Sequence, residues 1–421
     1  MPTPDVPLQK LGFLTIGVFD GDDPRPGMEA LLTQIQLGEE LGFDSAWLLH
    51  RHLQFGVSSP VAIMAAASQR TSRIELGTAV TPLAWENPLR LAEDLATVDL
   101  LSGGRINPGV STSQPMRWDD VKDALYPDTQ DVEDFSYERV SRFLAMVGGE
   151  PVTTATTQGI EVYSDRIQPH SPGLRDRVWY GAGSHRSAAW AASQRLNLLT
   201  SSVLTGATDG DFAGTQGAQI AAYREAFPEG RVSQGLVVIP TDSATPAQRE
   251  KYEAYAAARL PRTREPQGPG KLLFAPDVVG TSEQIAEQLY AHAGFQQVTE
   301  VAFALPFSFD HEDYVQILTD TAEKLGPALA GLAPERLLVF CDEDAPVSDP
   351  VRALREAADP AAAPPLAVLV GPEGGFSEDE RAAIRARPNT VALSLGPRIL
   401  RADTAAVAVL TLVQAVLGDA R

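Results

Sequence analysis

Eight apolar runs of strand length recur along the first 330 residues, and this repetition limits the possible folds more than any other feature of the chain. A helix-length segment separates each run from the next. The runs are Leu11–Phe19, Ser45–Leu49, Ile74–Val80, Ile106–Val110, Val178–Ala182, Leu196–Ser201, Gly235–Pro240 and Glu300–Leu305. Eight alternating units predict an α/β fold, specifically a (β/α)₈ TIM barrel rather than an open sheet.

The chain is longer than one hydrophobic core usually supports, since single cores stop growing near roughly 250–300 residues. We predict a TIM-barrel domain over residues 1–332 and a second, small α/β domain over residues 333–421. In the second domain, 337–340 and 366–370 are expected strands, 359–365 a linker and 402–417 a helix. Two polar stretches of the first domain, 112–175 and 261–277, are expected to form loops over the active face of the barrel.

Composition excludes several classes of protein. A formal net charge of −21 argues against a general polyanion binder, so any RNA contact must be local. Cys341 is the only cysteine, which excludes an intramolecular disulfide and a multi-thiolate metal site. We predict no metal ligands. The start of the chain does not resemble a signal peptide and no apolar run reaches about 20 residues, so we expect a cytoplasmic protein without membrane contact.

Two segments of the first domain carry candidate chemistry. His50, Arg51 and His52 follow the second expected strand, where an imidazole could orient or protonate a bound group. The alternative is that both histidines only satisfy backbone groups. Gly183 and Ser184 open the expected helix 185–194, whose free N–H groups would face an anion. The alternative there is an ordinary turn with Ser184 as the N-cap.

The order of several motifs in the first domain resembles the bacterial luciferase-like flavin-dependent monooxygenases, over nearly all of residues 10–330. These motifs are Pro60-Val61-Ala62, Arg73 to Val80, Asn87-Pro88-Leu89-Arg90-Leu91-Ala92-Glu93-Asp94, and Asp99 to Arg105 with Ser102-Gly103-Gly104-Arg105. The resemblance implies that reduced FMN and O₂ insert one oxygen atom into a small organic substrate. It also implies a flavin reductase as the source of FMNH₂. We also expect the protein to be a homodimer.

The same resemblance assigns residues. Thr78, Ala79 and Val80 would line the flavin ring, where the family often has an unusual peptide bond. Arg105 and Ser184 would hold the FMN phosphate, and Gly183 would allow its close approach.

Among the expected catalytic residues, His52 matches the second histidine of the family's Glu-His-His pattern. Arg51 stands where luciferases carry a histidine base, and an arginine cannot act as a base near pH 7. Either His50 or His52 therefore takes that role, or the chemistry differs. F420-dependent hydride transfer, which the same superfamily contains, is an alternative, as is flavin binding without turnover.

The second domain resembles the C-terminal half of the knotted SPOUT enzymes that methylate uridine N3 in 16S rRNA. The resemblance rests on the turn Val370 to Phe376 and on the segment Leu395 to Ala405. It implies that S-adenosylmethionine contacts Gly371, Pro372, Glu373, Gly374, Leu395, Gly396, Ile399 and Leu400, and that Arg398 and Arg401 face rRNA or the target base. From the residues themselves, the glycine-rich turn suits backbone recognition of an adenosine, while Ser377 and Glu380 predict a helix-capping box.

This second match is partial, because the family's RNA-docking domain and first strands have no counterpart in the chain. The shortened sheet would expose an edge that a second copy of the chain could cover. We therefore favour a monooxygenase that carries a segment binding S-adenosylmethionine. An rRNA methyltransferase, a vestigial appendage and a tail used only for dimerisation are the alternatives.

Overall fold

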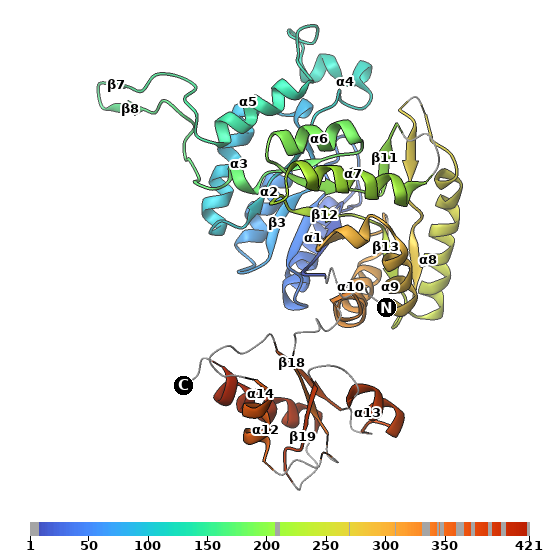
Figure 1. The fold of residues 1–421 in the computed structure, drawn as a ribbon. Helices are drawn as coiled ribbons and strands as arrows, with labels where there is room; N and C mark the ends of the chain where they lie inside the picture. The colour runs from blue at the N-terminus through green and yellow to red at the C-terminus, as the bar shows by residue number, and fades with distance from the viewer. Residues whose placement is uncertain are drawn as a thin grey trace. The chain divides into compact units, whose positions relative to one another are not determined.

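The structure is a computed structural model that describes residues 8–206, 211–268, 270–307, 309–330, 337–342, 345, 349–358, 366–371, 375–385, 390–396 and 401–418. Internal contacts divide the chain into two units, Met1–Leu329 and Ala330–Arg421 (Figure 1). The predicted boundary between residues 332 and 333 lies outside the described residues and stays a prediction.

The first unit contains a closed parallel barrel. Its ten strand segments are β1 (Lys10–Thr15), β2 (Ser45–Leu48), β3 (Glu75–Thr78), β4 (Thr81–Pro82), β5 (Ile106–Asn107), β6 (Gly109–Ser111), β9 (Trp179–Gly181), β10 (Asn197–Thr200), β12 (Val232–Gln234) and β16 (Glu300–Ala304). They pair in the order β4-β6-β9-β10-β12-β16-β1-β2-β3-β5. Because β4 continues β3 and β6 continues β5 along the chain, the two ends of this order meet. The predicted TIM barrel is confirmed.

Amphipathic helices follow the strands and surround the barrel (Figure 1). Helix α3 (Pro88–Ser102) shows why they form where they do: Asn87 Oδ1 accepts the N–H groups of Leu89 and Arg90, and Gly103 ends the helix at φ 72°. The others are α1 (Pro24–Glu40), α2 (Pro60–Ser68), α5 (Tyr137–Val147), α6 (His185–Ser193), α7 (Phe212–Ala226), α8 (Pro246–Arg259), α9 (Ser282–Ala291) and α10 (His311–Asp320). In the part of the chain that the structure describes, no helix has the length and apolar character needed to cross a membrane.

Two tryptophans fill the interior of the barrel. The rings of Trp47 and Trp179 meet edge to face at 5.3 Å, and Leu199 and Ala302 pack against them. Gly77 is required beside them, because a Cβ atom there would lie 2.4 Å from the Trp47 ring. The barrel is therefore a packed core rather than a channel.

Charged side chains close the N-terminal end of the barrel beneath these rings. The Arg231 guanidinium lies 4.8 Å from the centroid of the Trp179 ring. It donates to Glu300 at 2.7 Å and to Glu75 at 3.1 Å, and Lys10 also pairs with Glu75. These residues precede or begin strands, so they lie at the end of the barrel opposite the strand C-termini. Only the C-terminal end is left open to a ligand.

One strand prediction is wrong. The seventh barrel strand is β12, whereas the predicted run 235–240 contributes β13 (Val238–Pro240), which pairs with β15 (Val278–Gly280) outside the barrel sheet. The error has a physical cause. Residues 236–239 form a continuous apolar run that is buried, so they look like the barrel strand, whereas β12 itself includes the polar residues Ser233 and Gln234. Ser233, which lines a cavity of the barrel, and Gln234, which contacts Gln216 of α7, interrupt the apolar pattern that predicts a buried strand.

The two predicted insertions contain regular structure. Residues 112–175 form α4 (Trp118–Leu125), α5 and a hairpin of β7 (Thr156–Gln158) with β8 (Glu161–Tyr163), which projects from the barrel (Figure 1). Residues 261–277 include most of the short helix η3 (Leu260–Thr263) and β14 (Leu272–Phe274), which pairs with β11 (Val203–Thr205).

The second unit is a small α/β structure, as predicted. Strand β17 (Leu337–Cys341) lies between β18 (Leu366–Val370) and β19 (Thr390–Leu393), and all three are parallel. The helices are α12 (Pro350–Ala357), α13 (Glu378–Arg385) and α14 (Ala402–Leu417). Ser377 and Glu380 form the predicted capping box at the start of α13. The linker 359–365 lies outside the described residues, and the knot stays a prediction.

We predict that Arg231→Met destabilises the first unit by about 3–5 kcal/mol, because it leaves the Glu75 and Glu300 carboxylates close together without their shared cation. Urea unfolding followed by near-ultraviolet circular dichroism, which reports tryptophan packing, measures this change. Arg90→Met removes two surface ion pairs, to Glu93 and Asp94, and should change stability by about 1 kcal/mol or less. Equal effects of the two substitutions would contradict the structural role of Arg231.

Candidate functional site

A cavity of about 500 Å³ opens at the C-terminal ends of the barrel strands. Its wall is largely apolar, and small residues line it at the end of β9. The residues concerned are Leu14, Ala79, Val80, Gly181, Ala182, Gly183, Leu199, Val237, Ala302 and Ala304. TIM-barrel enzymes place their active sites at this end. The cavity therefore suits a ligand with a flat apolar part.

The bend between β3 and β4 brings two of the predicted flavin-contacting residues into this wall. Ala79 and Val80 line the cavity and are joined by a cis peptide bond. Thr78 is fully buried within the barrel wall instead, where its hydroxyl donates to Gly109 O at 2.7 Å and accepts the Gly109 N–H at 2.9 Å. Ala79 and Val80 are thus placed to touch a ligand, whereas Thr78 supports the neighbouring strand.

The structure brings together His50, Arg51 and His52. His50 and Arg51 line the cavity, and His52 lies beside it, with its ring 4.3 Å from the His50 ring and stacked at 4.0 Å on Trp85. His50 Nε2 lies 2.7 Å from Ser58 O. Because a carbonyl can only accept, Nε2 carries the proton and Nδ1 carries the lone pair. Nδ1 is buried without a hydrogen-bond partner in the structure.

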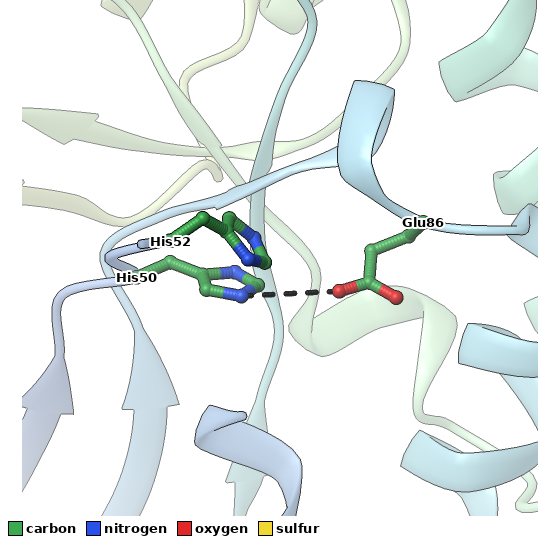
Figure 2. A group of neighbouring side chains, drawn as sticks. All are labelled: His50, His52 and Glu86. Carbon is green, nitrogen blue, oxygen red and sulfur yellow. Dashed lines mark ion pairs between the residues drawn. The ribbon is translucent and has the colours of Figure 1, made fainter. Parts of the chain in front are cut away.

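Glu86 completes this group and was missed by the sequence analysis. Its Oε1 lies 3.8 Å from His50 Nε2 (Figure 2). Burial, reinforced by the charge of Asp94, raises the pKa of Glu86 to about 7. Burial, reinforced by His52, lowers the pKa of His50 to about 4. Near neutral pH the imidazole is therefore neutral and the carboxyl group titrates. His50, which lines the cavity, and Glu86, which lies beside His50, can therefore hold a proton next to the cavity.

His50, His52 and Glu86 are also the group of described residues that could hold a metal ion, with donor atoms within 4.8 Å of one another. The donors of a formed zinc site lie roughly 3.3 Å apart, since each is about 2.0–2.1 Å from the ion. Here His50 Nε2 is already engaged with Ser58. The present arrangement of the three residues is therefore not that of a formed zinc site.

The predicted phosphate site is only partly at the cavity. Gly183 lines it. Ser184 is the N-cap of α6: its Oγ accepts the Ser187 N–H at 3.3 Å, and Ser187 Oγ accepts the Ser184 N–H at 3.0 Å. The capping interpretation of Ser184 is confirmed. An anion at this turn would meet the backbone N–H groups of the first helical turn.

Arg105 does not lie at the cavity, and its predicted role in binding phosphate is corrected here. It precedes β5, so it stands at the N-terminal end of a barrel strand. Its guanidinium donates to backbone oxygens of Ser68, Thr71, Ile74 and Ser102 at 2.8–3.0 Å. In a parallel barrel the residue before a strand and the residues after it lie at opposite ends, so Arg105 clamps the α2–β3 and α3–β5 connections.

In the second unit, the structure describes only some of the residues predicted to contact S-adenosylmethionine or RNA. Gly371 follows β18, and Leu395 and Gly396 follow β19, so all three lie at the same edge of the parallel sheet. Gly396 has φ 121°, which L-residues rarely adopt. Arg401 is exposed and precedes α14. The remaining predicted residues lie outside the described ranges: Pro372, Glu373, Gly374, Arg398, Ile399 and Leu400.

One buried carboxylate at this same edge was not predicted. Asp342 follows β17, its side chain is almost completely buried, and it pairs with Arg381 and Arg385 of α13. This pairing anchors α13 to the end of the central strand.

Comparisons with known proteins agree with this division. A family model for luciferase-like monooxygenases matches residues 10–297, and a model for an RNA methyltransferase domain matches residues 318–414. The chain is 31% identical over 153 residues to 4-hydroxyprotoasukamycin monooxygenase of Streptomyces nodosus subsp. asukaensis, covering 35% of this chain and 40% of that protein. It is 25% identical over 185 residues to the alkanal monooxygenase alpha chain of the Kryptophanaron alfredi symbiont, covering 43% and 51%. These matches span about half or less of each relative.

Solved structures share the fold of the first unit. Monooxygenase RslO1 from Streptomyces bottropensis superposes with a TM-score of 0.58 at 17% identity, over 76% of this chain and 99% of that one. The FMN-bound oxygenating constituent of 3,6-diketocamphane monooxygenase from Pseudomonas putida gives 0.52 at 13% identity, over 76% and 98%. An F420-dependent secondary alcohol dehydrogenase gives 0.53 at 15% identity, over 76% and 98%. At these identities the likeness concerns the fold alone.

We predict that Glu86→Gln makes stability less dependent on pH. The pKa of Glu86 in the folded protein, about 7, lies above its ordinary value of 4.5, so the folded protein binds this proton more tightly than the unfolded chain does. That contribution is complete below pH 4.5 and is lost as the pH rises through about 7. The variant should match the wild type near pH 4.5 and exceed its stability at pH 8.5 by roughly 1–3 kcal/mol.

Urea unfolding at the two pH values measures this difference. Glu40→Gln, which removes an exposed carboxylate, is the control and should give the same offset at both. A Glu86→Gln offset that does not change with pH would contradict the raised pKa.

Proposed function

The chain belongs to the luciferase-like monooxygenase family, and we propose that its first unit is a monooxygenase that uses reduced FMN and O₂ on a small organic substrate. The observation that carries this proposal is the cavity at the C-terminal end of the barrel, lined by Ala79, Val80 and Gly183 and bordered by the His50–Glu86 pair. A separate flavin reductase would supply the reduced cofactor, and the protein would act as a homodimer.

The cavity wall is compatible with FMN. Its apolar residues and cluster of small side chains at the end of β9 would accept a planar ring, and the nearest atom to a Cβ built on Gly183 is 3.4 Å away, in Thr205. The phosphate would bind at the turn formed by Gly183 and the start of α6. When bound, reduced FMN supplies the two electrons with which one atom of O₂ enters the substrate and the other leaves as water.

The protein's own residues would divide the remaining tasks. The packed tryptophans and apolar wall exclude water from the bottom of the cavity. Glu86 and His50 would hold the proton that the reaction needs, and His52 would position His50 through its stacking on Trp85. Arg51 stays charged near neutral pH and cannot act as the base.

F420-dependent hydride transfer is the main alternative for the first unit, because relatives and fold neighbours include F420-dependent enzymes. Mass spectrometry of small molecules released from the purified protein distinguishes the two cofactors. FMN supports the proposal, and F420 would contradict it.

For the second unit we propose S-adenosylmethionine binding at the sheet edge that carries Gly371, Leu395 and Gly396. The support is the RNA methyltransferase model over residues 318–414 and the parallel sheet that brings these residues to one edge. Methylation of 16S rRNA is the activity that would follow if an RNA substrate docks there.

We predict that Gly183→Ala weakens FMN binding by roughly tenfold while the fold is retained. The added methyl group would lie at ordinary contact distance from Thr205 but would occupy the surface on which the cofactor approaches the backbone. Fluorescence titration with FMN measures the Kd. Gly270→Ala, at an exposed glycine outside the cavity lining, is the control. An unchanged FMN affinity in Gly183→Ala would show that the phosphate does not bind at this turn.

We predict that the full-length chain binds S-adenosylmethionine in titration calorimetry and that Gly396→Ala weakens this binding tenfold or more. Alanine disfavours the φ of 121° that shapes the turn after β19. The FMN affinity of the same variant should be unchanged. An absence of S-adenosylmethionine binding by the wild type would contradict the proposal for the second unit.

A further inference from the structure

Three arginines line the cavity, and two of them share a single carboxylate. They are Arg51 after β2, Arg259 at the end of α8 and Arg262 in η3. Asp277, whose side chain is only 2% exposed, pairs closely with Arg259, at 2.5 and 3.2 Å. Arg262 approaches the same carboxylate only to 3.9 Å. No Asp or Glu is among the described residues that line the cavity itself.

Two of these guanidinium groups therefore have unused donors. Among the described residues, Arg262 Nε has no hydrogen-bond partner. This atom is buried, and the whole side chain is only 26% exposed. The Arg51 guanidinium has no ion-pair partner within the described ranges, and its recorded contact is with the Phe307 ring at 5.6 Å. A partly buried cation without a partner is unfavourable, because it has lost hydration without gaining a compensating charge.

Aromatic rings hold all three guanidinium groups. Arg51 and Arg259 both lie over the ring of Phe307, at 5.6 and 5.5 Å from its centroid. Arg262 lies over Phe274 at 4.3 Å. Stacking occupies the flat face of a guanidinium and leaves its N–H edge free. That edge matches the paired oxygens of a carboxylate, sulfonate or phosphate.

We propose that Arg51, Arg259 and Arg262 form a subsite for an anionic group of the ligand that occupies the cavity. Three cations against one carboxylate give this region an excess of two positive charges in a chain whose formal net charge is −21. An anion would satisfy the unused donors that the protein leaves open. The proposal rests on the proposed function for its ligand: with the FMN phosphate at the start of α6, the subsite accepts an anionic substrate. The FMN phosphate itself is the other source of the same chemistry.

The first experimental arm tests the substrate as the source of the anion. Octanoate and octan-1-ol, which have the same chain length and differ in charge, are titrated calorimetrically into the FMN-loaded, full-length protein. We expect the wild type to prefer octanoate by tenfold or more. Arg51→Met and Arg262→Met should reduce this preference to about twofold or less, while Arg51→Lys should retain part of it. Arg264→Met, an exposed neighbour outside the cavity lining, should leave it unchanged.

The second arm tests the cofactor as the source. FMN and riboflavin, which lacks the phosphate, are titrated into the ligand-free protein. If the subsite binds the FMN phosphate, the Arg51→Met and Arg262→Met substitutions will weaken FMN binding tenfold or more and leave riboflavin binding unchanged. If it binds a substrate anion, the affinity for FMN will not change. Weakened FMN binding supports the anion subsite with the FMN phosphate as its ligand. Unchanged FMN affinity supports a subsite for a substrate anion only together with the loss of octanoate preference in the first arm.

A third variant distinguishes loss of the anion subsite from loss of folded structure. Asp277→Asn removes the carboxylate that competes for these arginines, so it should strengthen octanoate binding, and a gain of affinity cannot come from lost structure. If none of these substitutions alters octanoate or FMN binding, the subsite proposal is overturned. Failure of the wild type to bind FMN would instead overturn the proposed function, and octanoate binding to the ligand-free protein would still test the arginines.

Discussion

The closed N-terminal end of the barrel is the constraint on which the rest of the site depends. Trp47 and Trp179 fill the interior, and Arg231 links Glu75 and Glu300 beneath them. Since this end is filled by large rings and paired charges, a ligand can enter only from the strand C-termini. The loops that follow the strands therefore supply the chemistry, whereas residues that precede the strands, such as Arg105, serve stability.

Within the cavity, different groups control charge and protons. Burial lowers the pKa of His50 and raises the pKa of Glu86, so it favours the neutral form of each group. Near pH 7 the pair is therefore neutral or carries one negative charge, on Glu86. The guanidinium groups of Arg51, Arg259 and Arg262 line the same cavity. A ligand would thus meet a proton-handling group and a fixed cationic group on one apolar surface. This arrangement suits a substrate that combines an apolar body with an anionic group.

The sequence predicted the barrel well, because seven of its eight strands coincide with apolar runs that are separated by helical segments. It predicted Ala79, Val80 and Gly183 as cavity residues from resemblance to a family. It misplaced Arg105, because the resemblance was followed although Arg105 directly precedes the expected strand 106–110 and so lies at the end of the barrel opposite the cavity. Glu86 was missed because its raised pKa arises from burial, which the sequence does not show. Arg259 and Arg262 were missed because their role depends on contacts that the sequence does not show. The two arginines share one carboxylate, Asp277, and each lies over an aromatic ring.

The central claim is that FMN occupies the cavity at the C-terminal end of the barrel. Hydrogen–deuterium exchange of the full-length protein with and without FMN tests it most directly. The account predicts slower exchange on FMN binding at residues 79–82 and 181–187, and unchanged exchange at residues 102–106, on the opposite end of the barrel. Protection confined to residues 102–106, or the absence of protection at the cavity under saturating FMN, would contradict it.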